Sequence, residues 1–198
     1  MASSTKITLD QQQRQQLAPL RFHKVFFALI PPHHILKELQ ALQVYFQQDF
    51  KGRYIEYANL HSTLVYIGTV EESMILSLKN ALASITITPF DAQIISISMA
   101  HNTHAKMLWA DLAKEPITSI IESIENVILN QTHIKYEKKY EIKPHITLAR
   151  LSKEMNNKII ESMPLNLSWH VDTIYALESV QNAFGQVSYK TLFTIKLS

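Results

Sequence analysis

His61-Ser62-Thr63-Leu64 reappears in the second half of the chain as His145-Ile146-Thr147-Leu148. Each copy lies in an apolar stretch typical of a β-strand, the first over residues 60–67 and the second over residues 144–151. Side chains alternate between the two faces of a strand, so the His and Thr of each copy point the same way, with Cα atoms about 6–7 Å apart. The Leu beside each pair points to the opposite face, into a core. Two such strands side by side would present two imidazoles and two hydroxyls to one cleft.

These residue types suit phosphoryl chemistry. An imidazole can accept or donate a proton near neutral pH, and a hydroxyl can donate a hydrogen bond to an oxyanion such as phosphate. With a cyclic phosphodiester between the strands, one histidine would deprotonate an attacking water, and the other would protonate the departing ribose oxygen. Both proton transfers are then covered without a metal. The residues alone leave open which histidine is the acid.

A single histidine in a strand is more often a half-buried residue bonded to a neighbour than a catalyst. The repetition of the motif in two similar strands, with apolar flanks on both copies, favours the catalytic interpretation. There is no Gly-rich phosphate loop, Gly-x-Ser-x-Gly or His-Glu-x-x-His to support a kinase, a serine hydrolase or a zincin.

The composition is that of a soluble globular protein. Of 198 residues, 46% are hydrophobic and 18% are charged, and the net charge of +2 permits an anionic substrate. The absence of cysteine excludes disulfides and thiol nucleophiles, and it favours a cytoplasmic location. No apolar run approaches the ~20 residues of a membrane span. Residues 1–20 are polar and glutamine-rich, and we expect a flexible extension ahead of one domain at residues 21–198.

Hydrophobic periodicity predicts an α+β fold. Over residues 90–100, for example, alternation places Ile95, Ile97 and Met99 on one face of a strand. The motif copies predict two lobes with one histidine from each. The expected strands are 24–30, 53–57, 60–68, 90–100, 107–112, 144–151, 169–180 and 186–197, and the expected helices are 31–48, 71–85, 116–128 and 153–162.

The chain resembles the two-histidine (2H) phosphoesterase superfamily, and within it the RNA 2′,3′-cyclic phosphodiesterases, also called 2′-5′ RNA ligases. Similar segments occur in the same order from about residue 21 to the end. They are Val25–Pro31, Asn59–Leu64 closing at Ile67-Gly68, Leu108–Ala110, Lys143–Arg150, and Glu178-Ser179 followed by Gly185 and Tyr189.

The resemblance implies a bilobed α+β fold in which two antiparallel sheets with flanking helices enclose a central cleft. It implies metal-independent hydrolysis of 2′,3′-cyclic phosphates to 2′-phosphates, with reversible 2′-5′ RNA ligation as a further activity. His61 would be the proton donor and His145 the proton acceptor, while Thr63, Thr147 and Arg150 would bind substrate. Strict alternation turns Arg150 away from His145, so a bulge or the end of the strand would have to turn it inward.

We further expect a monomer that uses no cofactor, holds no metal and contacts no membrane. The resemblance implies that its substrate is RNA or a nucleotide with a 2′,3′-cyclic phosphate end. Two alternatives remain open within the nucleotide-related functions. One is a 2H phosphodiesterase with another substrate, such as a 2′-5′ oligonucleotide or an ADP-ribose cyclic phosphate. The other is a non-catalytic nucleotide- or RNA-binding module. A structural protein with coincidental motifs is a third possibility.

Several other residues could line the cleft. His101-Asn102-Thr103-His104 predicts a loop between strands, with metal ligation by the two histidines disfavoured because no third ligand is near. Residues 135–143 interleave basic and aromatic side chains, which suits phosphate contact or an exposed loop equally. Four aromatic residues could stack a base: Tyr57, Trp109, Phe184 and Tyr189. Trp109 and Phe184 fit the core as well.

Overall fold

The computed structural model describes residues 20–101, 106–136, 143–152 and 162–198. The expected extension at residues 1–20 lies outside this part except for its last residue. The helix expected at 153–162 lies outside it except for Ser162, and so do Asn102, Thr103 and His104. His101 is the last residue of a strand rather than part of a loop.

All strand pairings in the described residues are antiparallel. Hydrogen bonds link the strands in the order β7-β4-β5-β6-β3-β1-β8-β9, and β2 pairs with β6 beside this path. The strands are β1 (Phe22–Leu29), β2 (Gly52–Tyr54), β3 (Ser62–Glu71), β4 (Phe90–His101), β5 (Lys106–Leu112), β6 (His145–Leu151), β7 (Met163–Val171), β8 (Thr173–Gln181) and β9 (Val187–Lys196).

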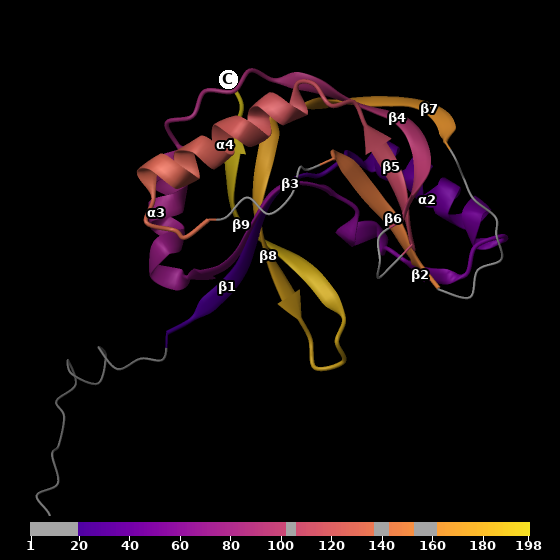
Figure 1. The fold of residues 1–198 in the computed structure, drawn as a ribbon, viewed down its shortest axis with the longest axis horizontal. Coiled ribbons are helices and arrows are strands. Elements are labelled where there is room, and N and C mark those ends of the chain that lie inside the picture. The colour runs from indigo at the N-terminus through magenta and orange to yellow at the C-terminus, as the bar shows by residue number, and fades with distance from the viewer. Residues whose placement is uncertain (1–19, 102–105, 137–142, 153–161) are drawn as a thin grey trace, which may run out of the picture.

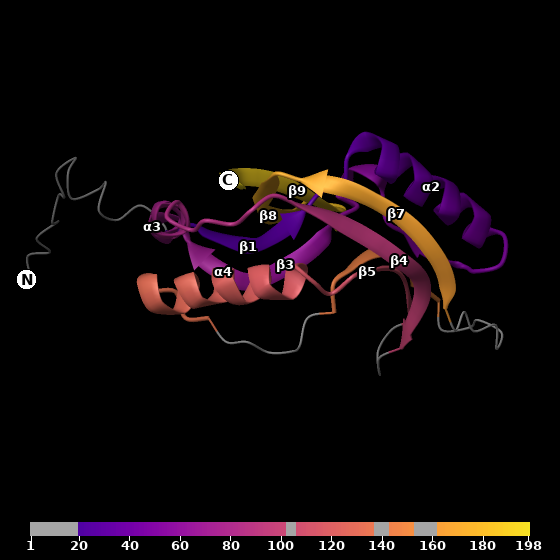
Figure 2. The same ribbon diagram turned by 90° about the horizontal axis from the view of Figure 1, so that it is seen from above.

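The strands divide into two halves that meet at one point. One half holds β1, β3, β8 and β9, and the other holds β2, β4, β5, β6 and β7. Between β3 and β6 the pairing is that of Ser62 with Ile146. The α+β class and the two-lobed arrangement are confirmed, except that the two expected sheets are hydrogen-bonded into one strongly curled sheet at this junction (Figures 1 and 2). His61 and His145 directly precede the paired residues, so the junction brings the two motifs together.

Three α-helices cover the sheet in the described part of the chain: α2 (His33–Gln47), α3 (Glu72–Leu82) and α4 (Ile117–Gln131). Proline residues directly precede α2 and α4, where a missing N–H costs no helical hydrogen bond. Figure 1 shows α3 and α4 beside the half that contains β1 and β3, and α2 beside the half that contains β2 and β6. The isoleucines that recur at helical spacing in α4 are buried: Ile117, Ile120, Ile121, Ile124 and Ile128.

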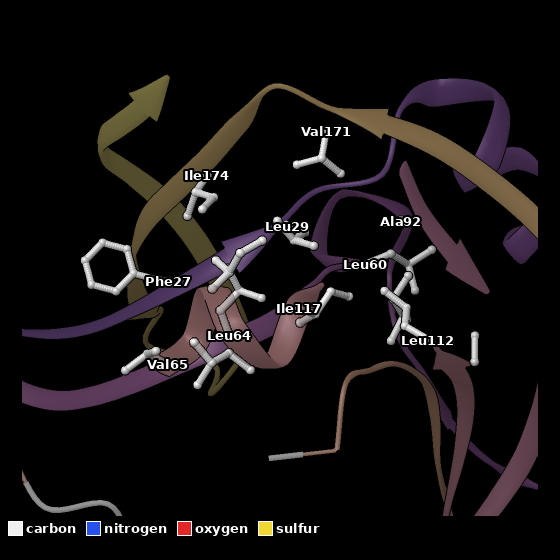
Figure 3. Close-up of a cluster of buried hydrophobic side chains, with 14 of the residues drawn as sticks. Phe27, Leu29, Leu60, Leu64, Val65, Ala92, Leu112, Ile117, Val171 and Ile174 are labelled. Atoms are coloured by element: carbon white, nitrogen blue, oxygen red, sulfur yellow. The ribbon is translucent and has the colours of Figure 1, made fainter. Parts of the chain in front are cut away.

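A continuous hydrophobic core runs through both halves. Figure 3 shows side chains from β1, β3, β8 and α4 packed together, with neighbours from the other half beside them. Leu64 and Leu148, the last residues of the two motifs, are fully buried in this core. Burying each leucine contributes about 1.5–3 kcal/mol. The alternation of the motif therefore works as predicted, with the leucine inward and the histidine on the other face.

Two strand predictions were wrong in detail. The strand expected at 169–180 is two strands, because the chain passes at Asp172 from β7, which pairs with β4, to β8, which pairs with β1 and β9. No glycine or proline marks this change of partner. In β4 a register shift between Ile94 and Ser96 interrupts the alternation, so Ile94 is buried and Ile95 is exposed.

Candidate active site

His61 lies between a short 3-10 helix (Tyr57–Asn59) and the start of β3. Its Nδ1 is 2.7 Å from the carbonyl oxygen of Asn59, so Nδ1 carries the hydrogen and donates it. Its Nε2 is 3.2 Å from Oγ1 of Thr63, the hydroxyl of the same motif. The ring also packs against Phe26 and Tyr189, with centroids 5.1 and 4.8 Å away. The imidazole is thus held in one orientation on three sides.

His145, the first residue of β6, is held in the same manner. Its Nδ1–H donates to the carbonyl oxygen of Lys143 at 2.6 Å, again two residues before the histidine. Trp109 of β5 stacks on the imidazole, with ring centroids 3.8 Å apart and planes inclined by 21°. In both motifs Nδ1–H is hydrogen-bonded to a backbone carbonyl, so Nε2 is the nitrogen that can exchange a proton with a substrate.

Burial lowers the pKa of both histidines. For His61, the charge of His145 lowers the pKa further, while the hydrogen bond to Asn59 opposes both effects. For His145, the hydrogen bond to Lys143 and the carboxylate of Asp111, its register partner on β5, work against the effect of burial. The two imidazoles therefore influence each other, and a second proton on the pair is disfavoured.

The two threonines lie on the strands that carry the histidines. Thr63 is half-buried and pairs with Ala28 of β1, and Thr147 is half-buried and pairs with Trp109 of β5. When His61 is neutral, the hydroxyl of Thr63 donates to Nε2. When Nε2 is protonated, that hydroxyl hydrogen is free to turn toward an anion.

Strand β6 contains a bulge just before Arg150, one of the two features that could change the direction of this side chain. The register with β5 shifts between the pairs Leu108–Ala149 and Trp109–Thr147, leaving Leu148 as the extra residue. Leu148 and Ala149 are both fully buried as a result, and Arg150 is exposed. Arg150 lines a pocket together with Asn59 and Tyr189, the neighbours of His61.

The four aromatic candidates have different surroundings. Trp109 stacks on His145 and Tyr189 packs edge-on against His61, so both belong to the site. Tyr57 instead contacts His33, with its hydroxyl 2.5 Å from Nδ1. Phe184 is 90% exposed at the tip of the β8–β9 hairpin, so its interpretation as a core residue was wrong. Phe26 was not identified as a site residue from the sequence, because its position in an apolar strand looks like core.

Within the described residues, no group of three or more His, Asp or Glu side chains is placed to hold a metal ion. Among the same residues, no helix is long and apolar enough to cross a membrane.

Residues 30–109 match the family model of LigT-like phosphoesterases. A curated relative, the RNA 2′,3′-cyclic phosphodiesterase of Methanocaldococcus jannaschii, is 26% identical over 137 residues, which cover 68% of this chain and 75% of the relative. The predicted resemblance to this family is confirmed.

Solved structures have the same fold. The protein TT0787 of Thermus thermophilus superposes with a TM-score of 0.74 at 21% identity, covering 88% of this chain and 97% of that one. Escherichia coli LigT complexed with 3′-AMP superposes with a TM-score of 0.73 at 19% identity, covering 90% of this chain and 99% of LigT. At these identities the similarity establishes the LigT-type fold.

Proposed function

We propose that the protein is a metal-independent phosphodiesterase that hydrolyses RNA or nucleotide 2′,3′-cyclic phosphates to 2′-phosphates. One observation carries the proposal. Both motif histidines donate Nδ1–H to a backbone carbonyl two residues earlier, which leaves two Nε2 atoms as the proton-exchanging groups at the junction of the lobes. The relative from M. jannaschii, named as an RNA 2′,3′-cyclic phosphodiesterase, supports the same reaction class.

The proposed reaction starts with a protonated His61 and a neutral His145. Nε2 of His145 takes a proton from water, and the water oxygen forms a bond to phosphorus. The bond between phosphorus and O3′ breaks, and Nε2–H of His61 donates its proton to O3′. The products are a 2′-phosphate and a 3′-hydroxyl. Exchange of one proton with solvent at each imidazole restores the starting state.

The remaining residues stabilise charge in this proposal. The hydroxyls of Thr63 and Thr147 donate to the non-bridging oxygens, where negative charge grows in the transition state. Arg150 adds a positive charge beside the cleft. The carboxylate of Asp111 favours a positively charged His145, which is the form that results when this residue accepts the proton. If the 5′-hydroxyl of a second RNA replaced the attacking water, its oxygen would bond to phosphorus while the bond to O3′ breaks, and the same two imidazoles would support 2′-5′ ligation.

Phosphorus NMR of the products tests this proposal. Adenosine 2′,3′-cyclic phosphate, a short RNA with a cyclic phosphate end, a 2′-5′ dinucleotide and an ADP-ribose cyclic phosphate are each incubated with the protein in EDTA. We expect a 2′-phosphate to form from the first two substrates. Formation of a 3′-phosphate would overturn the assigned leaving group. Binding of these compounds without turnover would favour a nucleotide- or RNA-binding module instead.

A further inference from the structure

A pocket of about 260 Å³ adjoins the histidine pair without including either histidine. It is lined by residues of β2 and the segment that follows it, of β6, and of β9 with the residue before it. Its charged lining residues are Arg53, Arg150 and one carboxylate, Glu56. Two of its lining residues also support His61: Asn59 through its carbonyl oxygen, and Tyr189 through its ring. An anion in this pocket would therefore be separate from a phosphate held between the imidazoles, but next to it.

Two arginines lie side by side in the lining of this pocket. Arg53 of β2 is the direct register partner of Arg150 of β6. Like charges directly opposite each other destabilise a β-ladder, and no ion pair of the described residues joins either arginine to a carboxylate. Burial raises the pKa of Tyr189, but the charges of Arg150 and Arg53 oppose the rise, so both guanidinium groups act on the tyrosine beside His61.

The backbone holds this arginine pair in place. Gly52 pairs with Leu151, and a Cβ atom at Gly52 would lie 2.5 Å from the carbonyl oxygen of Arg150. Only a residue without a side chain permits this approach of β2 to β6. The chain thus brings a second arginine to a site that already holds Arg150, against electrostatic repulsion. Binding of an anion between them would offset that repulsion.

We propose that Arg53, together with Arg150, binds a second phosphate of the substrate, on the 5′ side of the nucleotide that carries the cyclic phosphate. A guanidinium group binds a phosphate through two parallel N–H donors, and two guanidiniums suit one phosphodiester. The amide of Asn59 already donates to the carbonyl oxygen of Val187, and Oε1 of Gln186 already accepts from Asn182. The rings of Tyr54 and Tyr189 also line the pocket and would contact the attached nucleoside. This inference rests on the proposed function and names its substrate class: a nucleotide or oligonucleotide phosphorylated on the 5′ side.

Four substrates separate the contributions of charge and of an added nucleoside. They are adenosine 2′,3′-cyclic phosphate, its 5′-phosphorylated form, the dinucleotide ApA with a 2′,3′-cyclic phosphate end, and that dinucleotide with an uncharged methylphosphonate linkage. The ratio kcat/KM is measured for each at constant ionic strength. The intact protein is compared with Arg53→Gln, with Arg53→Lys, and with Arg21→Gln, an exposed arginine paired with Glu72.

We expect kcat/KM for the natural dinucleotide to be about tenfold higher than for adenosine 2′,3′-cyclic phosphate or for the methylphosphonate. This is the difference expected for one charge-assisted contact. Arg53→Gln should reduce this preference to about twofold, Arg53→Lys should retain part of it, and Arg21→Gln should retain all of it. If kcat/KM is also higher for the 5′-phosphorylated mononucleotide, a terminal 5′-phosphate is enough to occupy the second site. If kcat/KM is higher for the dinucleotide alone, the site binds the internucleotide phosphate. Either result supports a second phosphate site.

The inference is overturned if the methylphosphonate is hydrolysed as well as the natural dinucleotide, because the advantage would then come from the nucleoside. It is also overturned if Arg53→Gln leaves the preference unchanged. These failures differ from a failure of the proposed function. In that case the intact protein would hydrolyse none of the four substrates.

Discussion

The indole of Trp109 lies face to face with the imidazole of His145, with ring centroids 3.8 Å apart. This contact fixes the ring plane, while the hydrogen bond to the carbonyl of Lys143 fixes its rotation. An aromatic face also attracts a cation within about 6 Å. The stack therefore supports the proposed base in the neutral form that accepts the proton and in the charged form that results.

Replacing Trp109 should show how much this stacking contributes to kcat. We expect Trp109→Leu to lower kcat by about 3–10-fold, since aromatic pairs are worth about 0.5–1.5 kcal/mol beyond burial. Trp109→Phe keeps an aromatic face and should stay within about twofold of the intact protein. Initial rates on one cyclic phosphate at saturation measure this difference. Equal losses in the two variants would mean that the indole acts through volume alone.

The pH dependence follows from the direction of the two pKa shifts. The reaction requires His61 protonated and His145 neutral, which gives a bell-shaped profile of kcat/KM. Because both pKa values are lowered from 6.5, both limbs should move to lower pH, and the maximum should lie below 6.5. A bound anion favours both imidazolium forms, so the kcat profile should lie at higher pH than that of kcat/KM.

Rates over the range from about pH 4.5 to 8.5 at constant ionic strength would measure both profiles. A kcat/KM maximum well above neutrality would contradict the assigned pair. His145→Asn serves as a comparison, because loss of the base should remove the acidic limb while leaving little activity.

Substitution of Gly52 tests the close approach of β2 to β6. In Gly52→Ala the new methyl group meets backbone atoms of Arg150 and Leu151, so one strand must shift. We expect a loss of about 1–3 kcal/mol in the free energy of unfolding, as for other overpacked sites. Arg53→Gln on the same strand should be neutral or slightly stabilising, because it removes one of two facing charges. Denaturation in urea compares the two variants, and an unchanged midpoint for Gly52→Ala would contradict the account of this strand.

The sequence predicted the parts of the site that depend on local pattern. Alternation in the two motif strands correctly placed the leucines in the core and the histidines on the other face. It also indicated a bulge or a strand end near Arg150, where β6 has a bulge. Contacts that depend on long-range register were not predictable. Arg53 lies on a strand of three residues, and its opposition to Arg150 follows from pairing with a segment about one hundred residues away.

The change of partner at Asp172 was missed for a similar reason. A single residue, Asp172, separates β7 from β8, and no glycine or proline marks the change, so the sequence pattern did not separate the two strands. The break exists because the two strands pair with different halves of the sheet.

The central claim is that His61 and His145 act as one acid–base pair on one phosphate. The most direct measurement is the turnover of a 2′,3′-cyclic phosphate by His61→Ala, by His145→Ala and by the double variant, in EDTA. We expect each single variant to lose about 10²–10⁴-fold in kcat, and the double variant to lose little more, because groups that act as a unit are not additive. Activity near that of the intact protein in either single variant would contradict the claim, as would two losses that simply multiply in the double variant.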